Sequence, residues 1–101
     1  MAGFQVKVVL EGVQPPLWRR ILLPDQLSFA DLHVILQIVF GWQEEHLHDF
    51  SFQRSRVRIS DTEYADADLD EKDVCADSYL KAGWIRYTYD FGDDWRHKIV
   101  L

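Results

Sequence analysis

The sequence predicts an α+β fold in two layers, with one main helix packed on a mostly antiparallel or mixed β-sheet in a β-grasp-like arrangement. Three stretches carry this prediction. Residues 4–12 alternate apolar and polar side chains as a half-buried strand does, residues 28–40 have the wide apolar stripe of a helix, and residues 84–101 alternate again on both sides of a turn. The chain of 101 residues ends inside an apparent strand, so we expect a single domain, residues 1–101, truncated at its C-terminus.

The remaining elements follow from turn and cap signals. Prolines between residues 13 and 16 cannot continue a ladder, so they separate the first strand from a second. Ser28 is expected to cap the main helix and Gly41 to end it in a left-handed conformation. The other predicted elements are strands at 17–23, 46–53, 56–60, 84–91 and 95–101, a solvated acidic loop at 61–77, and a short helix within 73–83.

Side-chain parity predicts the register of the last hairpin. Phe91 and Trp95 both belong to the inward-facing set, so residues opposite each other have numbers with an even sum. A three-residue loop at 92–94 keeps this parity. The predicted pairs are Asp90 with Arg96, Tyr89 with His97, and Tyr87 with Ile99, and the first of them is expected to form a cross-strand ion pair.

Charge is unevenly distributed along the chain. The net charge is −6, and residues 61–77 hold eight acidic side chains and one lysine, which leaves the rest nearly neutral. The clustered bases that bind many phosphates are not evident, so nucleic-acid binding by this domain alone is not expected. Cys75 is the one cysteine and no apolar run approaches the roughly 20 residues that span a bilayer, so we expect a cytoplasmic protein without membrane contact.

Histidines provide the candidate metal site. His46 and His48 lie two residues apart on a predicted strand and therefore point the same way, with His97 on an inward face and Asp93 and Asp94 nearby in the hairpin. These five side chains could hold a divalent transition metal such as zinc, iron or nickel. The alternative is that the histidines are partly buried and hydrogen-bonded to carboxylates or backbone.

A candidate interaction surface consists of Trp18, Arg19, Arg20 and Trp42. Tryptophan and arginine side chains can stack on bases and contact phosphate. The alternative is that one arginine pairs with Asp90, Asp93 or Asp94 while Trp18 covers the edge of the core. His33, on the main helix, is expected at the boundary of the core. No complete set of acid, base and nucleophile is visible, so we expect no catalytic residues.

Three blocks, "GVQPPLWRRILLPDQLSFADLHVILQIVFGW", "HLHDF" and "YTYDFGDDWRHKI", resemble in this order the plasmid pRiA4b ORF-3-like family. The resemblance implies an α+β domain of unsettled biochemical function. Some members carry resolvase-type labels, and the family often continues into a segment with cysteine and proline that is absent here.

The leading functional hypothesis is a non-enzymatic protein-interaction or accessory module, on which a protein partner or the missing C-terminal segment docks. The first alternative is a metal-binding domain or metal-dependent enzyme that uses His46, His48 and His97. The second is a DNA-associated accessory protein of a mobile element.

Overall fold

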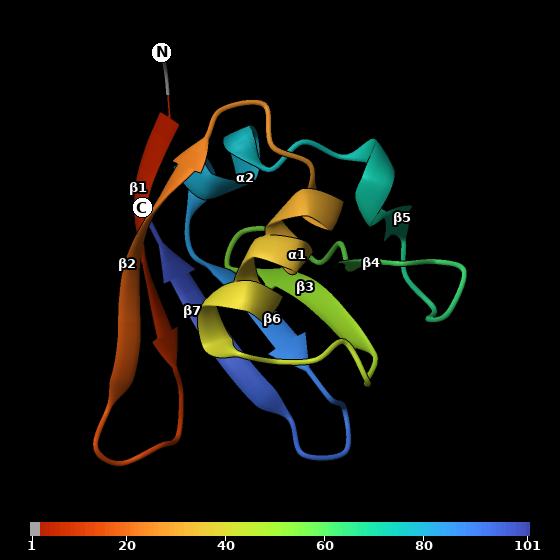
Figure 1. Ribbon diagram of the computed structural model, residues 1–101. Helices are drawn as coiled ribbons and strands as arrows, with labels where there is room; N and C mark the ends of the chain where they lie inside the picture. The colour runs from red at the N-terminus through yellow and green to blue at the C-terminus, as the bar shows by residue number, and fades with distance from the viewer. Residues whose placement is uncertain (1–2) are drawn as a thin grey trace.

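The computed structural model describes residues 3–101, which form one seven-stranded sheet with helix α1 lying across one of its faces (Figure 1). The strands are β1 (Gly3–Leu10), β2 (Leu17–Pro24), β3 (His48–Phe52), β4 (Ile59–Ser60), β5 (Leu69–Asp70), β6 (Ile85–Tyr89) and β7 (Trp95–Val100). The helices are α1 (Phe29–Phe40), α2 (Asp77–Ala82) and the 3₁₀ helix η1 (Glu71–Asp73).

The strand order in the sheet is β2-β1-β7-β6-β3-β4-β5. Every neighbouring pair is antiparallel except β4 with β5, which is parallel. A mostly antiparallel sheet with one main helix is therefore confirmed. The narrower β-grasp-like arrangement stays a prediction. Within residues 3–101, no helix is both long and apolar enough to cross a membrane.

Helix α1 has the ends that its flanking residues predict. The Ser28 hydroxyl accepts a hydrogen bond from the Asp31 N–H at 3.1 Å, which satisfies one of the free donors of the first turn. Gly41 ends the helix with φ 73°, a left-handed conformation that glycine adopts without a Cβ clash. The buried face of α1 consists of Phe29, Leu32, His33, Leu36 and Gln37, so two polar side chains lie among the apolar ones.

The core lies between α1 and the sheet face that it covers. Alternate residues of the central strands fill it, in agreement with the predicted alternation; among the fully buried side chains are Val6, Val8, Phe50, Ile85, Tyr87 and Ile99. Paired residues of neighbouring strands lie on the same face of the sheet, so a residue that is paired with a core-facing residue also faces the core.

The hairpin of β6 and β7 has the predicted parity but a different register. Tyr87 faces His97 and Ile85 faces Ile99, so both predicted partners were wrong by two residues. The connection contains five residues, 90–94, because Asp90 takes φ 64° and its carboxylate accepts the N–H groups of Gly92 and Asp93.

The expected ion pair between Asp90 and Arg96 is wrong for the same reason. Arg96 faces Thr88 across the hairpin and binds the Asp94 carboxylate at 2.7 Å. Asp90 lies in the turn, 3.6 Å from the His46 imidazole.

The acidic segment 61–77 is a structured part of the fold, which corrects the expectation of a solvated loop. It contains β5, η1 and the start of α2. Asp70 caps η1 by accepting the Lys72 N–H, and this turns the next side chain, Glu71, into the interior, where it is 5% exposed. The segment thereby brings a buried carboxylate next to α1 and β3.

Candidate functional site: a cleft with paired histidines

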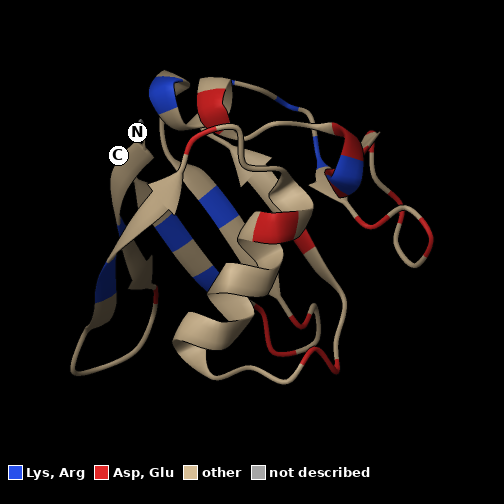
Figure 2. Ribbon diagram, turned by 45° about the horizontal axis from the view of Figure 1, so that its top comes forward, with Lys and Arg blue, Asp and Glu red and all other residues tan. Residues whose placement is uncertain are grey.

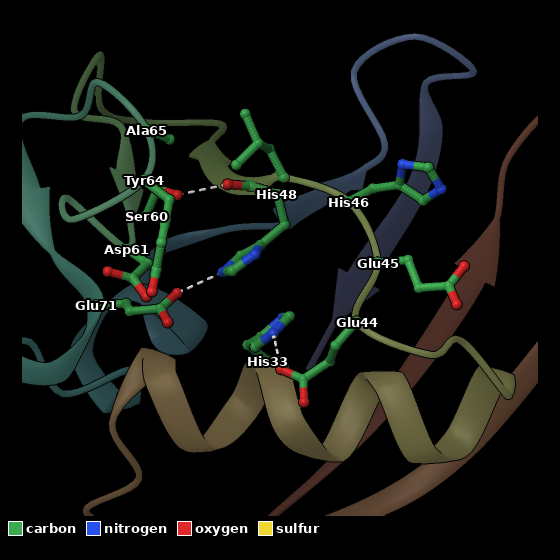
Figure 3. A pocket seen from close by; sticks show the side chains of 11 residues that line it. His33, Glu44, Glu45, His46, His48, Ser60, Asp61, Tyr64, Ala65 and Glu71 are labelled. Carbon is green, nitrogen blue, oxygen red and sulfur yellow. Dashed lines mark hydrogen bonds and ion pairs between the residues drawn. The ribbon is translucent and has the colours of Figure 1, made fainter.

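A cleft of about 370 Å³ opens between α1, the start of β3 and the acidic segment (Figure 3). Its volume is in the range of small-ligand pockets. The lining residues are His33, Glu44, Glu45, His46, Leu47, His48, Ser60, Asp61, Tyr64, Ala65 and Glu71. They come from four separate stretches of the chain, so the cleft exists only in the folded domain.

Two imidazoles form the floor of the cleft. The rings of His33 on α1 and His48 on β3 stack with their centroids 3.6 Å apart and their planes 6° from parallel. Both residues are buried, at 6% and 8% exposure. Such a stacked pair of ionisable rings disfavours charge on both at once, because like charges at this distance repel strongly.

Each imidazole binds its own glutamate, on opposite sides of the stack. His33 Nε2 lies 2.8 Å from Glu44 Oε1, and His48 Nε2 lies 2.6 Å from Glu71 Oε1. Figure 3 shows the Glu44 carboxylate below His33, on the α1 side, and Glu71, the first residue of η1, on the other side of the pair beside His48. Glu71 is buried, whereas the Glu44 side chain is 58% exposed and is free to reach a ligand.

A hydrogen-bond chain fixes the proton positions at His33. The Gln37 side-chain N–H donates to the Tyr87 hydroxyl at 2.9 Å, and this hydroxyl donates to His33 Nδ1 at 2.6 Å. The tautomer follows from Glu44, since an ionised carboxylate only accepts hydrogen bonds: neutral His33 carries its proton on Nε2 and donates it to Glu44, which leaves Nδ1 as the acceptor. Burial, and next the neighbouring His48, lower the pKa of His33, which is consequently neutral at pH 7.

The backbone also holds Glu44 in place. Glu44 has φ 53°, a left-handed conformation that is unfavourable for a residue with a Cβ. Its N–H donates to Gln37 Oε1 at 2.8 Å, and the next N–H, of Glu45, donates to the Tyr89 hydroxyl at 2.9 Å. Strained residues that their surroundings hold in place are common at functional sites.

The predicted metal ligands do not converge. His48 lies in the cleft, but the His46 side chain is half exposed and points away from the His33–His48 pair (Figure 3). Asp93 and Asp94 are exposed in the turn between β6 and β7. Among residues 3–101, no group of three or more His, Cys, Asp or Glu side chains lies in a position to hold a metal ion.

His97 belongs to the core beneath the C-terminal end of α1, with no exposed surface. Trp42 Nε1–H donates to His97 Nε2 at 3.0 Å, and His97 Nδ1–H donates to the Tyr87 carbonyl at 3.0 Å. Both ring nitrogens are thus engaged in a neutral imidazole, and burial lowers its pKa. His97 therefore matches the alternative interpretation, a buried and hydrogen-bonded histidine.

The predicted interaction surface is divided between two places. Trp42 stacks on Tyr89 and adjoins Trp95, so it covers the core. Trp18, Arg19 and Arg20 are exposed on β2, where Arg19 binds the Trp18 carbonyl. In the described part of the chain, no ion pair joins either arginine to Asp90, Asp93 or Asp94, so that expectation is wrong.

Three members of the cleft were missed or misplaced from the sequence. His33 was expected at the core boundary, and Glu44 and Glu71 were not singled out. The signal for His33 was present: it follows Leu32 and precedes Gln37 by four positions, so both polar residues share the buried face of α1. Two polar residues on one buried helical stripe indicate a hydrogen-bonded site.

Lowering the pH from about 7 to about 5 is expected to reduce the free energy of unfolding. His33 and His97 have lowered pKa values in the folded chain, so the unfolded chain binds more protons once the pH falls below about 6.5. Their stabilising contribution is complete above that pH. Below it, each of the two histidines lowers the free energy of unfolding by up to about 1.4 kcal/mol per pH unit. Urea denaturation at constant ionic strength measures this loss.

The variant His97→Gln provides the control for this pH dependence. A glutamine does not titrate, and its amide oxygen can take the place of Nε2 as the acceptor of the Trp42 N–H, so the variant should show a shallower decline. Unchanged or rising wild-type stability between about pH 7 and about pH 5 would contradict the expectation.

Comparison with known proteins assigns the chain to a family. The model of the plasmid pRiA4b ORF-3-like protein family matches residues 2–101. The chain belongs to this family. Among relatives, an uncharacterised protein y4hQ of Sinorhizobium fredii is 34% identical over 100 residues, which are 96% of this chain and 52% of that protein.

The crystal structure of a second similar protein supports the fold. MM3350 of Methanosarcina mazei Go1, a protein of unknown function, superposes with a TM-score of 0.84 at 34% identity. The match covers 98% of this chain and 59% of MM3350. The chain thus spans somewhat more than half the length of both similar proteins, and neither name states an activity.

Proposed function

We propose that this domain is a non-enzymatic protein-interaction module whose histidine cleft binds an arginine side chain of a partner protein. One observation carries the proposal: four carboxylates line the cleft, from Glu44, Glu45, Asp61 and Glu71, and no lysine or arginine does. Three imidazoles also line the cleft, and even with all of them charged the four carboxylates would leave it net negative. The cleft therefore attracts a cation.

The walls of the cleft favour a guanidinium group over an ammonium. Glu44 presents an exposed carboxylate that can accept two parallel N–H bonds, a geometry that arginine provides and lysine does not. Tyr64 offers an exposed ring for stacking, and Leu47 and Ala65 offer apolar surface for the aliphatic stem.

The polar groups of the cleft support binding more than catalysis. Both nitrogens of His33 are engaged, and His48 Nε2 is held by Glu71. The Ser60 hydroxyl donates to the His48 backbone carbonyl and not to an imidazole. The serine in the cleft wall therefore lacks the neighbouring base that activates a nucleophile.

Titration with N-acetyl-arginine methylamide, followed by amide chemical shifts in ¹H–¹⁵N NMR spectra, tests the proposal. We expect shifts at cleft residues such as Leu47 and Ala65 and weak binding, since a single side chain buries little surface. The citrulline analogue has the same shape without the charge and should bind about tenfold more weakly or not at all.

Matched variants distinguish binding in the cleft from attraction by the overall negative charge of the protein. Glu44→Gln retains an acceptor for His33 but loses the charge, and should weaken arginine binding about tenfold. Glu63→Gln removes one charge from the acidic segment outside the cleft, so it should leave the affinity nearly unchanged. Equal effects of the two variants, or equal binding of arginine and citrulline analogues, would contradict the proposal.

A further inference from the structure

The face of the sheet opposite α1 differs in character from the cleft. Odd-numbered residues of β1 point to this outer face, and the register carries the same face across the sheet. One row runs across β2, β1, β7, β6 and β3; it consists of Trp18, Val9, Lys98, Arg86 and Ser51. With strands about 4.8 Å apart, this row spans roughly 19 Å.

Basic side chains gather on the outer face although the chain as a whole is acidic. They are Lys7, Arg20, Arg86, Arg96 and Lys98, together with Arg58, which binds Asp49 of the same face. Figure 2 shows the basic residues as blue bands on adjacent strands, while acidic residues concentrate in the connections. Strand pairing thus brings lysine and arginine residues that are scattered along the sequence together into one basic surface.

Three of these bases lack a carboxylate partner within residues 3–101. Arg58, Arg86 and Arg96 form ion pairs with acidic side chains. No ion pair engages Lys7, Arg20 or Lys98 in the described part of the chain. These three lie on adjacent strands at the β2 side of the sheet, the end remote from the acidic segment.

Two tryptophans lie among the bases. Lys7 Nζ is 4.8 Å from the centre of the Trp18 ring, and Arg20 lies 5.7 Å from it. Arg86 and Lys98 lie 4.5 and 5.7 Å from the Trp84 ring in the same way. Trp18 remains 44% exposed, so part of an aromatic ring is accessible beside positive charge.

We propose that the outer face of the sheet binds a single-stranded nucleic acid. Lysine and arginine side chains without an acidic partner can neutralise phosphates. Exposed aromatic rings and guanidinium groups can stack on unpaired nucleobases. An open sheet face without a protruding element suits a splayed single strand better than a duplex, because reading a duplex groove requires an element that enters it. The surface lies on the side of the sheet opposite the histidine cleft and is independent of arginine binding there.

Fluorescence anisotropy with a labelled oligo(dT) or oligo(U) of about 12 nucleotides tests this proposal on the full chain. We expect binding at about 50 mM salt that weakens steeply towards about 200 mM. The logarithm of the affinity should fall with the logarithm of salt by about 0.7 for each phosphate contact, and Lys98→Ala should reduce that slope by about this amount.

Matched variants and competitors decide between a nucleic acid and any other polyanion. Trp18→Ala should weaken binding about tenfold, and Trp18→Phe less, because a ring for stacking remains. Lys72→Ala removes one charge from η1, away from the outer face, and should have little effect. No binding at low salt would overturn the proposal, as would polyglutamate or duplex DNA binding as tightly as the single strand, or full affinity of Trp18→Ala.

Discussion

Replacing Phe29 by alanine is expected to lower the free energy of unfolding by about 3–5 kcal/mol. Phe29 is the first residue of α1 and has no exposed surface. Its ring lies 4.9 Å from that of Phe50, 5.6 Å from Phe52 and 5.4 Å from Tyr79. The substitution therefore removes the side chain that joins α1 to both β3 and α2, and leaves a cavity in the centre of the core.

The exposed residue Ile38 provides the control for Phe29. It lies on the same helix with 75% of its surface exposed, so Ile38→Ala should change stability by no more than about 0.5 kcal/mol. Urea denaturation followed by circular dichroism measures the stability of both variants. The comparison requires that the free energy of unfolding depends on urea concentration with the same slope in both. A loss below about 1 kcal/mol for Phe29→Ala would contradict the description of this core.

Removing the Tyr87 hydroxyl is expected to destabilise the fold and to weaken the cleft. In Tyr87→Phe, His33 Nδ1 and the Gln37 amide both lose a buried hydrogen-bond partner, at a cost of about 1–3 kcal/mol. Gln37 also accepts the Glu44 N–H, so the lost restraint extends to the carboxylate that we propose binds arginine. Affinity for N-acetyl-arginine methylamide should fall together with stability.

Tyr64 is the matched control for this substitution. It lines the same cleft but is 68% exposed, and its hydroxyl forms no hydrogen bond within residues 3–101. Tyr64→Phe should therefore leave the free energy of unfolding within about 0.5 kcal/mol of the wild type. Equal stability losses in the two variants would show that the Tyr87 hydroxyl has no special role.

The elements that local chemistry controls were predicted well. The limits of α1 follow from Ser28 and Gly41, since a cap acts on backbone groups within one turn of itself. The alternation of β1 and the even parity of the last hairpin also follow from the sequence, because successive side chains of a strand point to opposite faces.

The register of the last hairpin was not predictable from parity alone. A shift of two residues keeps every side chain on its face, so parity cannot distinguish the predicted pairing from the observed one. The difference arises at Asp90, whose left-handed conformation and hydrogen bonds to Gly92 and Asp93 lengthen the turn. That conformation moves His97 from the predicted position opposite Tyr89 to one opposite Tyr87, on the same inward face.

The candidate site was only partly visible in the sequence. His48 was singled out, but its partner is His33, from the middle of the preceding helix and 15 positions earlier in the chain, and its carboxylate comes from the acidic segment. The sequence also indicated no basic surface, because Lys7, Arg20, Arg86 and Lys98 are far apart along the chain.

The sequence by itself determined where the main helix begins and ends, which strand residues face inward, and which family the chain resembles. Each of these depends on interactions between near neighbours or on motifs that can be read along the chain. Only the tertiary structure decided that His33 stacks on His48, that Glu71 is buried beside them, and that bases from four strands share one face. Strand order and register set those distances, and both depend on packing across the whole domain.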